Sequence, residues 1–116
     1  MKKPIKRSLN QVPLEDTHGG SGQKQLIFSS TDNISQQFEA WTKGYLPSHA
    51  SYDWHHHVDI AELFIVLSGS GIIEYEDGTK YKYVKDDVFF NPENLPHKIT
   101  DQSVAGSTFY FIRVNK

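Results

Sequence analysis

The sequence contains no cysteine, no block of like charges and no long apolar run. Without cysteine there is no disulfide framework, no thiolate zinc site and no thiol nucleophile, so any metal must be held by imidazole or carboxylate. A net charge of -2 without clustering gives no reason to expect nucleic acid or an anionic membrane as partner. No stretch approaches the ~20 apolar residues of a membrane span. The basic start at residues 1–7 is followed by nothing apolar, so it is not a signal peptide, and a cytoplasmic protein is expected.

The pattern that is present is that of β-strands. A chain of 116 residues is long enough for one domain with one core. Residues 1–23 show no apolar period and predict an N-terminal arm that is flexible or crosses a partner subunit. Residues 24–116 predict a single all-β domain, because about eight short strands with turn signals between them are typical of a sandwich, jelly roll or barrel. The strands are expected near residues 25–28, 38–46, 60–67, 73–75, 81–83, 88–90, 98–100 and 108–114.

Two of these segments can be interpreted further. A two-residue loop at Asp77-Gly78 would mix apolar and charged side chains on each face of its hairpin. A three-residue loop ending at Gly78 instead pairs Ile73 with Tyr81 and separates the two faces, so we predict the longer loop with a left-handed Gly78. The segment 60–67 is apolar on both faces apart from one glutamate. Such a strand needs cover on both sides, which favours a homodimer.

Three of the six histidines are consecutive. In a strand, residues i and i+2 share a face, so His55 and His57 point one way and His56 points the other. Two imidazoles on one face provide what a divalent ion needs, since metal–nitrogen bonds of ~2.0–2.1 Å place the ion between neighbouring rings. The sequence therefore predicts a metal site that includes His55 and His57.

Glu62 and His97 are two further candidate ligands. Glu62 follows His57 by five residues in an apolar strand, and a bend between them is required if the two are to share a face. A buried, unpaired carboxylate is costly, so a metal ion, a salt bridge or access to solvent must relieve that cost. His97 opens a strand directly after Pro96. Taken alone, such a histidine is an ordinary surface residue.

The spacing of these residues resembles that of the cupin family. His55-x-His57, four residues, Glu62, six residues and Gly69 resemble the first cupin motif. Pro92, three residues and Pro96-His97 fall where the second motif would lie. The resemblance covers residues 49–101, with strands on both sides. It implies a small single-domain cupin, an RmlC-like jelly-roll barrel of the double-stranded β-helix type.

The resemblance also carries functional residues with it. In the family, the positions that match His55, His57, Glu62 and His97 bind one metal ion, so these four are the expected ligands. The family prefers glycine at the positions of His49, Asp86 and Asn94, and often has asparagine at Asp101. Asn94, and Asp86 at some cost, can still adopt the left-handed conformation that such positions favour.

The expected function is to bind, or act on, a small organic molecule at one divalent metal ion. Four protein ligands leave one or two coordination positions open, and iron, nickel, zinc or manganese would each suit the donors. If the protein is an enzyme, dioxygenase and lyase or isomerase chemistry are both open. An aromatic pocket wall is expected, and its candidates are Tyr45, Phe64, Phe90 and Tyr110. Tyr52 and Trp54 have the parity of His56, which counts against them.

Three other interpretations stay open at this point. The protein could be a ligand-binding sensor without catalysis. It could be a metal-free isomerase or epimerase of sugars that uses His55 or His57 as its base. It could also use the two-histidine, one-carboxylate triad of iron oxygenases, formed by His57, Asp59 and His97, with Arg113 holding a co-substrate carboxylate. The remaining histidines, His18 and His49, are expected on the surface.

Overall fold

The computed structural model describes residues 3–17, 20 and 22–115, and these form ten β-strands and two short 3-10 turns. The turns are η1 (Leu9–Gln11) and η3 (Ser30–Asp32). The strands are β1 (Leu14–Thr17), β2 (Gly22–Ser29), β3 (Phe38–Leu46), β4 (Ser51–His55), β5 (Ile60–Ser68), β6 (Gly71–Tyr75), β7 (Lys80–Tyr83), β8 (Val88–Asn91), β9 (His97–Asp101) and β10 (Ser107–Asn115). Within the described part of the chain, no helix has the length and apolarity needed to cross a membrane.

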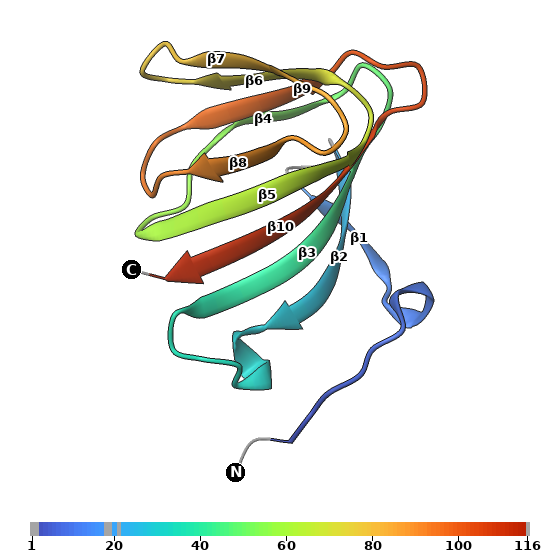
Figure 1. Cartoon of the computed structure of the whole chain (residues 1–116), viewed down its shortest axis with the longest axis vertical. Helices are drawn as coiled ribbons and strands as arrows, with labels where there is room; N and C mark the ends of the chain where they lie inside the picture. Colours follow the sequence, from blue (N-terminus) through green and yellow to red (C-terminus); the bar gives the residue numbers. More distant parts are fainter. Residues whose placement is uncertain (1–2, 18–19, 21, 116) are drawn as a thin grey trace.

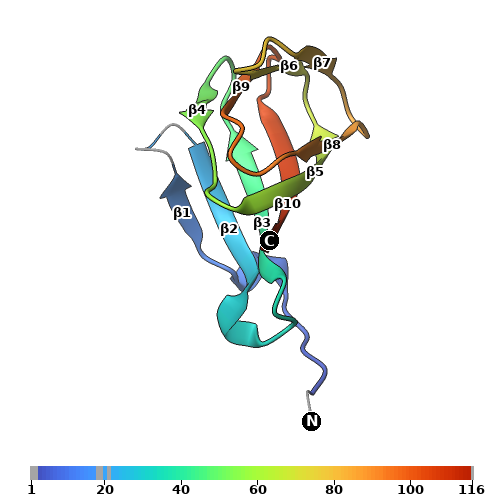
Figure 2. The same cartoon turned by 90° about the vertical axis from the view of Figure 1, so that its left-hand side faces the viewer.

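The strands form two antiparallel sheets that face each other (Figures 1 and 2). The larger sheet has the order β1-β2-β3-β10-β5-β8, and the smaller has the order β4-β9-β6-β7. Along β3 and β5, residues alternate between buried and more exposed, as expected for strands with one face on a core. The expected all-β jelly roll is therefore confirmed.

The interior between the sheets is mainly aromatic. Phe109 is 0% exposed, and its ring contacts the rings of Tyr52, Phe64, Tyr83 and Phe111. Tilted and edge-on rings of this kind fill a narrow barrel at high density. This aromatic cluster gives β4, β5, β7 and β10 a common core.

The turns at Gly78, Asp86 and Asn94 follow the predictions made from their residues, and His49 adopts the same conformation without having been predicted to. In the β6–β7 hairpin, Ile73 pairs with Tyr81, and Gly78 has a φ of 94°. At the positions where the cupin family prefers glycine, His49, Asp86 and Asn94 have φ values of 59°, 74° and 64°. All three therefore adopt the left-handed conformation without glycine, at some energetic cost.

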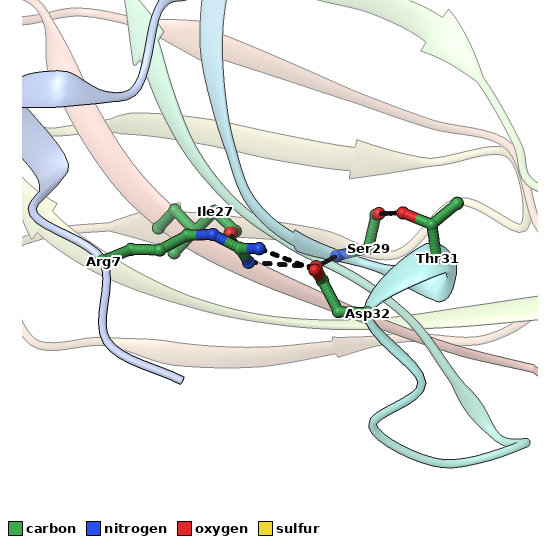
Figure 3. A network of polar contacts seen from close by, with 5 residues as sticks. All are labelled: Arg7, Ile27, Ser29, Thr31 and Asp32. Carbon is green, nitrogen blue, oxygen red and sulfur yellow. Dashed lines mark hydrogen bonds and ion pairs between the residues drawn. The ribbon is translucent and has the colours of Figure 1, made fainter. Parts of the chain in front are cut away.

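The predicted N-terminal arm is partly a strand of the larger sheet. β1 pairs with β2, so residues 14–17 extend the sheet edge. Nearer the start, the Gln25 side-chain amide donates to the carbonyls of Leu9 and Val12, at 2.8 and 2.9 Å. The Arg7 guanidinium binds the Asp32 carboxylate at 2.6 and 3.0 Å (Figure 3). Residues 3–17 thus pack against their own chain, and His18 lies outside the described residues.

Candidate functional site

A β-bulge positions the first histidine of the candidate site. β4 pairs with β9 so that Tyr52 is opposite Ile99 and His55 is opposite His97. Between these two pairs β4 advances by three residues and β9 by two, so β4 contains one extra residue. Such a bulge reverses the alternation of faces, so Tyr52 and His55 both face the interior. The parity expectation for Tyr52 was therefore wrong: it is 4% exposed and lies beside the histidines. Trp54 is 48% exposed and does not line the cavity that Tyr52 shares with His55 and His57.

The structure brings three imidazoles together at this end of the barrel. The ring centroids of His55 and His97 are 4.4 Å apart, those of His55 and His57 are 5.5 Å apart, and those of His57 and His97 are 6.5 Å apart. His56 is exposed, as predicted, although β4 ends at His55 and His56 and His57 follow the strand. His49 is also exposed, as expected.

Backbone carbonyls orient two of the rings. The Nδ1 of His55 lies 2.6 Å from the carbonyl of Asp53, and the Nδ1 of His97 lies 3.3 Å from the carbonyl of Leu95. A carbonyl only accepts, so each Nδ1 must carry the proton and each Nε2 the lone pair. That tautomer presents Nε2 to a metal ion. Burial lowers the pKa of His55, which also favours the neutral ring.

The bend required before Glu62 is present. Asp59 has a φ of 57°, and its N–H donates to the side-chain oxygen of Asn94 at 3.0 Å. β5 then starts at Ile60 and turns Glu62 inward, where it is 6% exposed. The Glu62 Oε1 lies 3.6 Å from the Nε2 of His97, and its Oε2 lies 3.7 Å from the Nε2 of His57. The glutamate thus faces two of the three imidazoles.

Asn91 is a site residue that the sequence reasoning missed. Its Nδ2 donates to the Glu62 Oε1 at 3.1 Å, while its Oδ1 accepts from the Tyr75 hydroxyl. Asn91 is 1% exposed and pairs with Glu62 across β8 and β5. Burial raises the pKa of Glu62 to about 7, although the hydrogen bond from Asn91 and the charge of Arg113 both act to lower it. A polar residue at an inward position of an apolar strand was the signal available in the sequence.

A cavity of about 260 Å³ lies beside these residues. Its lining mixes polar, charged and apolar groups: Asp16, Thr17, Lys24, Thr42, Tyr52, His55, His57, Glu62, Ile99, Phe111 and Arg113. None of the four aromatic residues expected for the wall lines this cavity. Phe64 is 3% exposed and belongs to the interior aromatic core. Phe90 and Tyr110 line an apolar groove of about 490 Å³ at the larger sheet, and Tyr45 donates to Gln25 Oε1 at 2.5 Å. Strand alternation predicts which side chains share a face of a sheet, but it does not decide which face of the sheet encloses the cavity.

The donor set suits a divalent transition metal. Three imidazoles and one carboxylate are the nitrogen and oxygen donors that manganese, iron, nickel and zinc accept. No group of three or more His, Asp or Glu side chains within the described ranges is already spaced to hold an ion. Two ligands with bonds of ~2.1 Å would lie roughly 3.0–3.4 Å apart. The separations of 3.6 and 3.7 Å from Glu62 to the two histidines are slightly longer than that.

The triad interpretation is not supported by this arrangement. Asp59 is exposed, and its Oδ1 accepts from the side-chain amide of Asn94 at 3.2 Å. It is absent from the cavity lining, where Glu62 lies instead. The carboxylate that faces His57 and His97 is therefore that of Glu62.

Comparison with known proteins agrees with the fold. Residues 44–111 match the family model described as a cupin domain. An uncharacterized protein, YdbB, from Bacillus subtilis (strain 168) is 40% identical over 47 residues, which is 40% of this chain and 42% of that protein. The match therefore spans less than half the length of that relative.

Two solved structures share the architecture over nearly the whole chain. A predicted oxalate decarboxylase from Thermotoga maritima has a TM-score of 0.86 at 16% identity, covering 97% of this chain and 100% of that one. An RmlC-like cupin from Shewanella frigidimarina NCIMB 400 has a TM-score of 0.76 at 19% identity, covering 100% and 96%. At these identities the likeness concerns the fold. With the family model matching more than half of its residues, the chain belongs to the cupin domain family.

Proposed function

We propose that this protein binds one divalent metal ion through His55, His57, Glu62 and His97, and that it holds a small organic molecule in the adjacent cavity. The observation that carries the proposal is the buried Glu62 carboxylate, which faces the Nε2 atoms of His57 and His97. An ionised carboxylate in this position is costly without a positive partner. A divalent ion between these donors would remove that cost.

The protein's own groups hold the proposed metal ligands in place and fix their orientation. The carbonyls of Asp53 and Leu95 fix the histidine tautomers, and Asn91 fixes the Glu62 carboxylate. Four protein ligands leave one or two positions for a small molecule or water. A bound divalent ion would supply Lewis acidity, polarising a carbonyl or acidifying water. No protein nucleophile is needed for such chemistry.

The test of this proposal is elemental analysis of protein purified without a histidine tag. We expect about one first-row transition metal per chain, as for a single-ion site. Metal-free protein should regain that content when manganese, iron, nickel or zinc is added. A protein that arrives metal-free and also refuses each of these ions would contradict the proposal. Turnover by the loaded protein would then separate an enzyme from a sensor.

Asn91 should matter for both stability and metal affinity. Asn91→Ala removes the donor to Glu62 and leaves the Tyr75 hydroxyl without its acceptor, deep in the barrel. We expect a loss of about 1–3 kcal/mol in the free energy of unfolding of the metal-free protein, the usual cost of orphaned buried polar groups. Metal affinity should fall about 10- to 100-fold, as it does when groups that orient ligands are removed.

The measurements for Asn91→Ala are denaturant unfolding of metal-free protein and titration with zinc. Gln102→Ala, at an exposed amide, is the matched control and should change neither quantity. If Asn91→Ala bound zinc as tightly as the unmodified protein, Asn91 would have no part in orienting Glu62.

We further propose that the outer face of the larger sheet pairs with a second copy of the chain. Leu63, Val88 and Phe90 are 46%, 70% and 57% exposed, and they border the apolar groove that also includes Trp41 and Ile112. The residues that line the groove belong to β3, β10, β5 and β8, which are neighbouring strands of the larger sheet (Figure 1). A contiguous apolar surface of this kind marks an interaction site. A homodimer would give β5 the cover on its second face that its sequence predicts.

The dimer is tested by light scattering coupled to size exclusion. We expect the unmodified protein at twice the chain mass, and Phe90→Lys at the mass of one chain, because a buried unpaired charge disrupts an apolar interface. Val104→Lys is the matched control: Val104 is 93% exposed but lies in the loop before β10, and its variant should remain dimeric. An unmodified protein that runs as a monomer at micromolar concentration would contradict this proposal.

A further inference from the structure

The cavity beside the histidines contains two cationic side chains that the metal proposal does not use. Arg113 on β10 pairs in register with Glu62 on β5, and directly paired residues share one face of a sheet. Arg113 is therefore on the interior face, and it lines the cavity together with Lys24 of β2. Neither side chain forms a hydrogen bond or an ion pair with another of the residues that the structure describes.

A half-buried guanidinium that makes no hydrogen bond or ion pair within the described part of the chain is unusual in a structural role. Arginine in a protein interior is normally paired, because its charge is costly to desolvate. A structural arginine at this position would be expected to bind Glu62, yet Glu62 faces His57, His97 and Asn91 instead. The guanidinium therefore stays available to a molecule inside the cavity.

The charges of the cavity favour an anion once a metal is bound. Its lining holds two carboxylates, Asp16 and Glu62, and two cations, Lys24 and Arg113. With neutral histidines these four charges cancel. A divalent ion on the histidines and Glu62 would leave about two positive charges uncompensated, and such a cleft attracts anions.

Hydroxyl groups and apolar groups complete the lining. Thr17 Oγ1 is buried and has no hydrogen-bond partner among the residues that the structure describes, although it lines the cavity. A buried hydroxyl without a partner costs free energy, which a bound acceptor would recover. Ile99 and Phe111 supply an apolar wall on the same cavity. The volume of about 260 Å³ is below the range of about 300–1,000 Å³ that is usual for drug-sized ligands.

We infer that the molecule held at this site is a small carboxylate, bound through its anionic group by Arg113, with Lys24 and Thr17 beside it. The planar guanidinium matches a carboxylate with two parallel hydrogen bonds. A phosphate is less well served, because the described residues that line the cavity lie on strands or just after one, and none is at a helix N-terminus. This inference rests on the proposed function, since the metal supplies the excess positive charge.

The experiment is calorimetric titration of zinc-loaded protein with malonate, with malonamide as the uncharged analogue. We expect malonate to bind and malonamide not to bind. Arg113→Gln should weaken malonate binding about 10- to 100-fold, the effect of losing charge-assisted hydrogen bonds, while zinc content stays at about one per chain. Lys24→Gln should weaken it less. Lys82→Gln, at an exposed lysine of β7 outside the cavity, is the matched control and should bind malonate normally.

The outcomes separate this inference from the proposed function. Zinc-loaded protein that binds malonate equally well with Arg113→Gln, or that prefers inorganic phosphate, overturns the carboxylate site but leaves the metal site intact. Protein that binds no metal refutes the proposed function. In that case malonate is titrated into the metal-free protein. Binding that depends on Arg113 would support an anion site, and its absence would overturn the inference as well. The thermal unfolding of Arg113→Gln verifies that the variant is folded.

Discussion

His57→Ala is expected to reduce the metal content of the purified protein from about one ion per chain to nearly none, whereas His56→Ala should leave it unchanged. The reason is geometric. The His57 Nε2 lies 3.7 Å from the buried Glu62 carboxylate, while His56 is exposed. Removing a direct ligand should cost more than the 10- to 100-fold typical of groups that only orient ligands.

The measurement is elemental analysis of untagged protein, followed by titration of metal-free protein with zinc. The two variants are matched because they delete the same imidazole at neighbouring positions. Circular dichroism should show that both are folded, since neither position belongs to the aromatic core. If His56→Ala lost the metal and His57→Ala kept it, the assignment of faces around β4 would be wrong. His97→Ala should behave as His57→Ala does.

The second large effect is expected at Asp101, at the opposite end of β9 from His97. Its carboxylate is 1% exposed and accepts from the backbone N–H groups of His49 and Ser103, both at 2.9 Å. It also accepts from the hydroxyls of Ser103 and Ser107, at 2.7 and 2.5 Å. Asp101→Ala would leave the two backbone N–H groups without this acceptor, while the hydroxyls of Ser103 and Ser107 would keep only the Gly106 carbonyl and the Tyr83 hydroxyl as partners. We expect a loss of about 3–5 kcal/mol in the free energy of unfolding, and a fall in Tm of roughly 10 °C or more.

Asp101→Asn is the informative companion variant. The amide keeps one oxygen for the two backbone N–H groups, and its NH2 can donate to serine hydroxyls, which accept as readily as they donate. We therefore expect a markedly smaller loss than for Asp101→Ala, measured by the same thermal and denaturant unfolding. Glu93→Ala, at an exposed carboxylate, should cost almost nothing. Equal stability of Asp101→Ala and the unmodified protein would show that these hydrogen bonds are not retained in solution.

The contribution of Asp101 should also depend on pH. Burial opposes its ionisation, but the hydrogen bonds from Ser103, Ser107 and His49 outweigh burial and hold the pKa of Asp101 below its ordinary value of 3.8. A lowered carboxyl pKa means that folding favours the ionised form. The stabilisation is therefore complete above the ordinary pKa and is lost as the pH falls through the lower pKa of the folded protein. The stability difference between the unmodified protein and Asp101→Ala should shrink correspondingly in acid.

Local rules account for the part of the site that the sequence predicted. The alternation expected of a strand predicted that His56 would point away from His55 and His57, and His56 is exposed, although β4 itself ends at His55. The need for a bend before Glu62 followed from the spacing, and Asp59 provides it with a φ of 57°. The β6–β7 register followed from keeping charged and apolar faces apart, and it is confirmed. In each case the deciding residues are at most eight positions apart along the chain.

The same rules failed where a β-bulge interrupts the alternation of side chains, or where strands far apart in the sequence enclose the cavity. The bulge in β4 turns Tyr52 to the same side as His55, which alternation alone cannot anticipate. The expected aromatic wall assumed that ring-bearing strands enclose the pocket, whereas Phe90 and Tyr110 face an outer groove. Which face of a sheet becomes the interior is decided when the two sheets close, and that is a property of the whole barrel.

The sequence by itself determined the β-rich class, the histidine and glutamate spacing, and the family that this spacing resembles. These depend on composition and on short-range order. Only the tertiary structure decided that Asn91 supports Glu62, and that Lys24 and Arg113 share the cavity with the histidines. Those residues lie on β8, β2 and β10, far from His55 along the chain. Their meeting results from long-range strand pairing and sheet closure, for which a short sequence motif carries no signal.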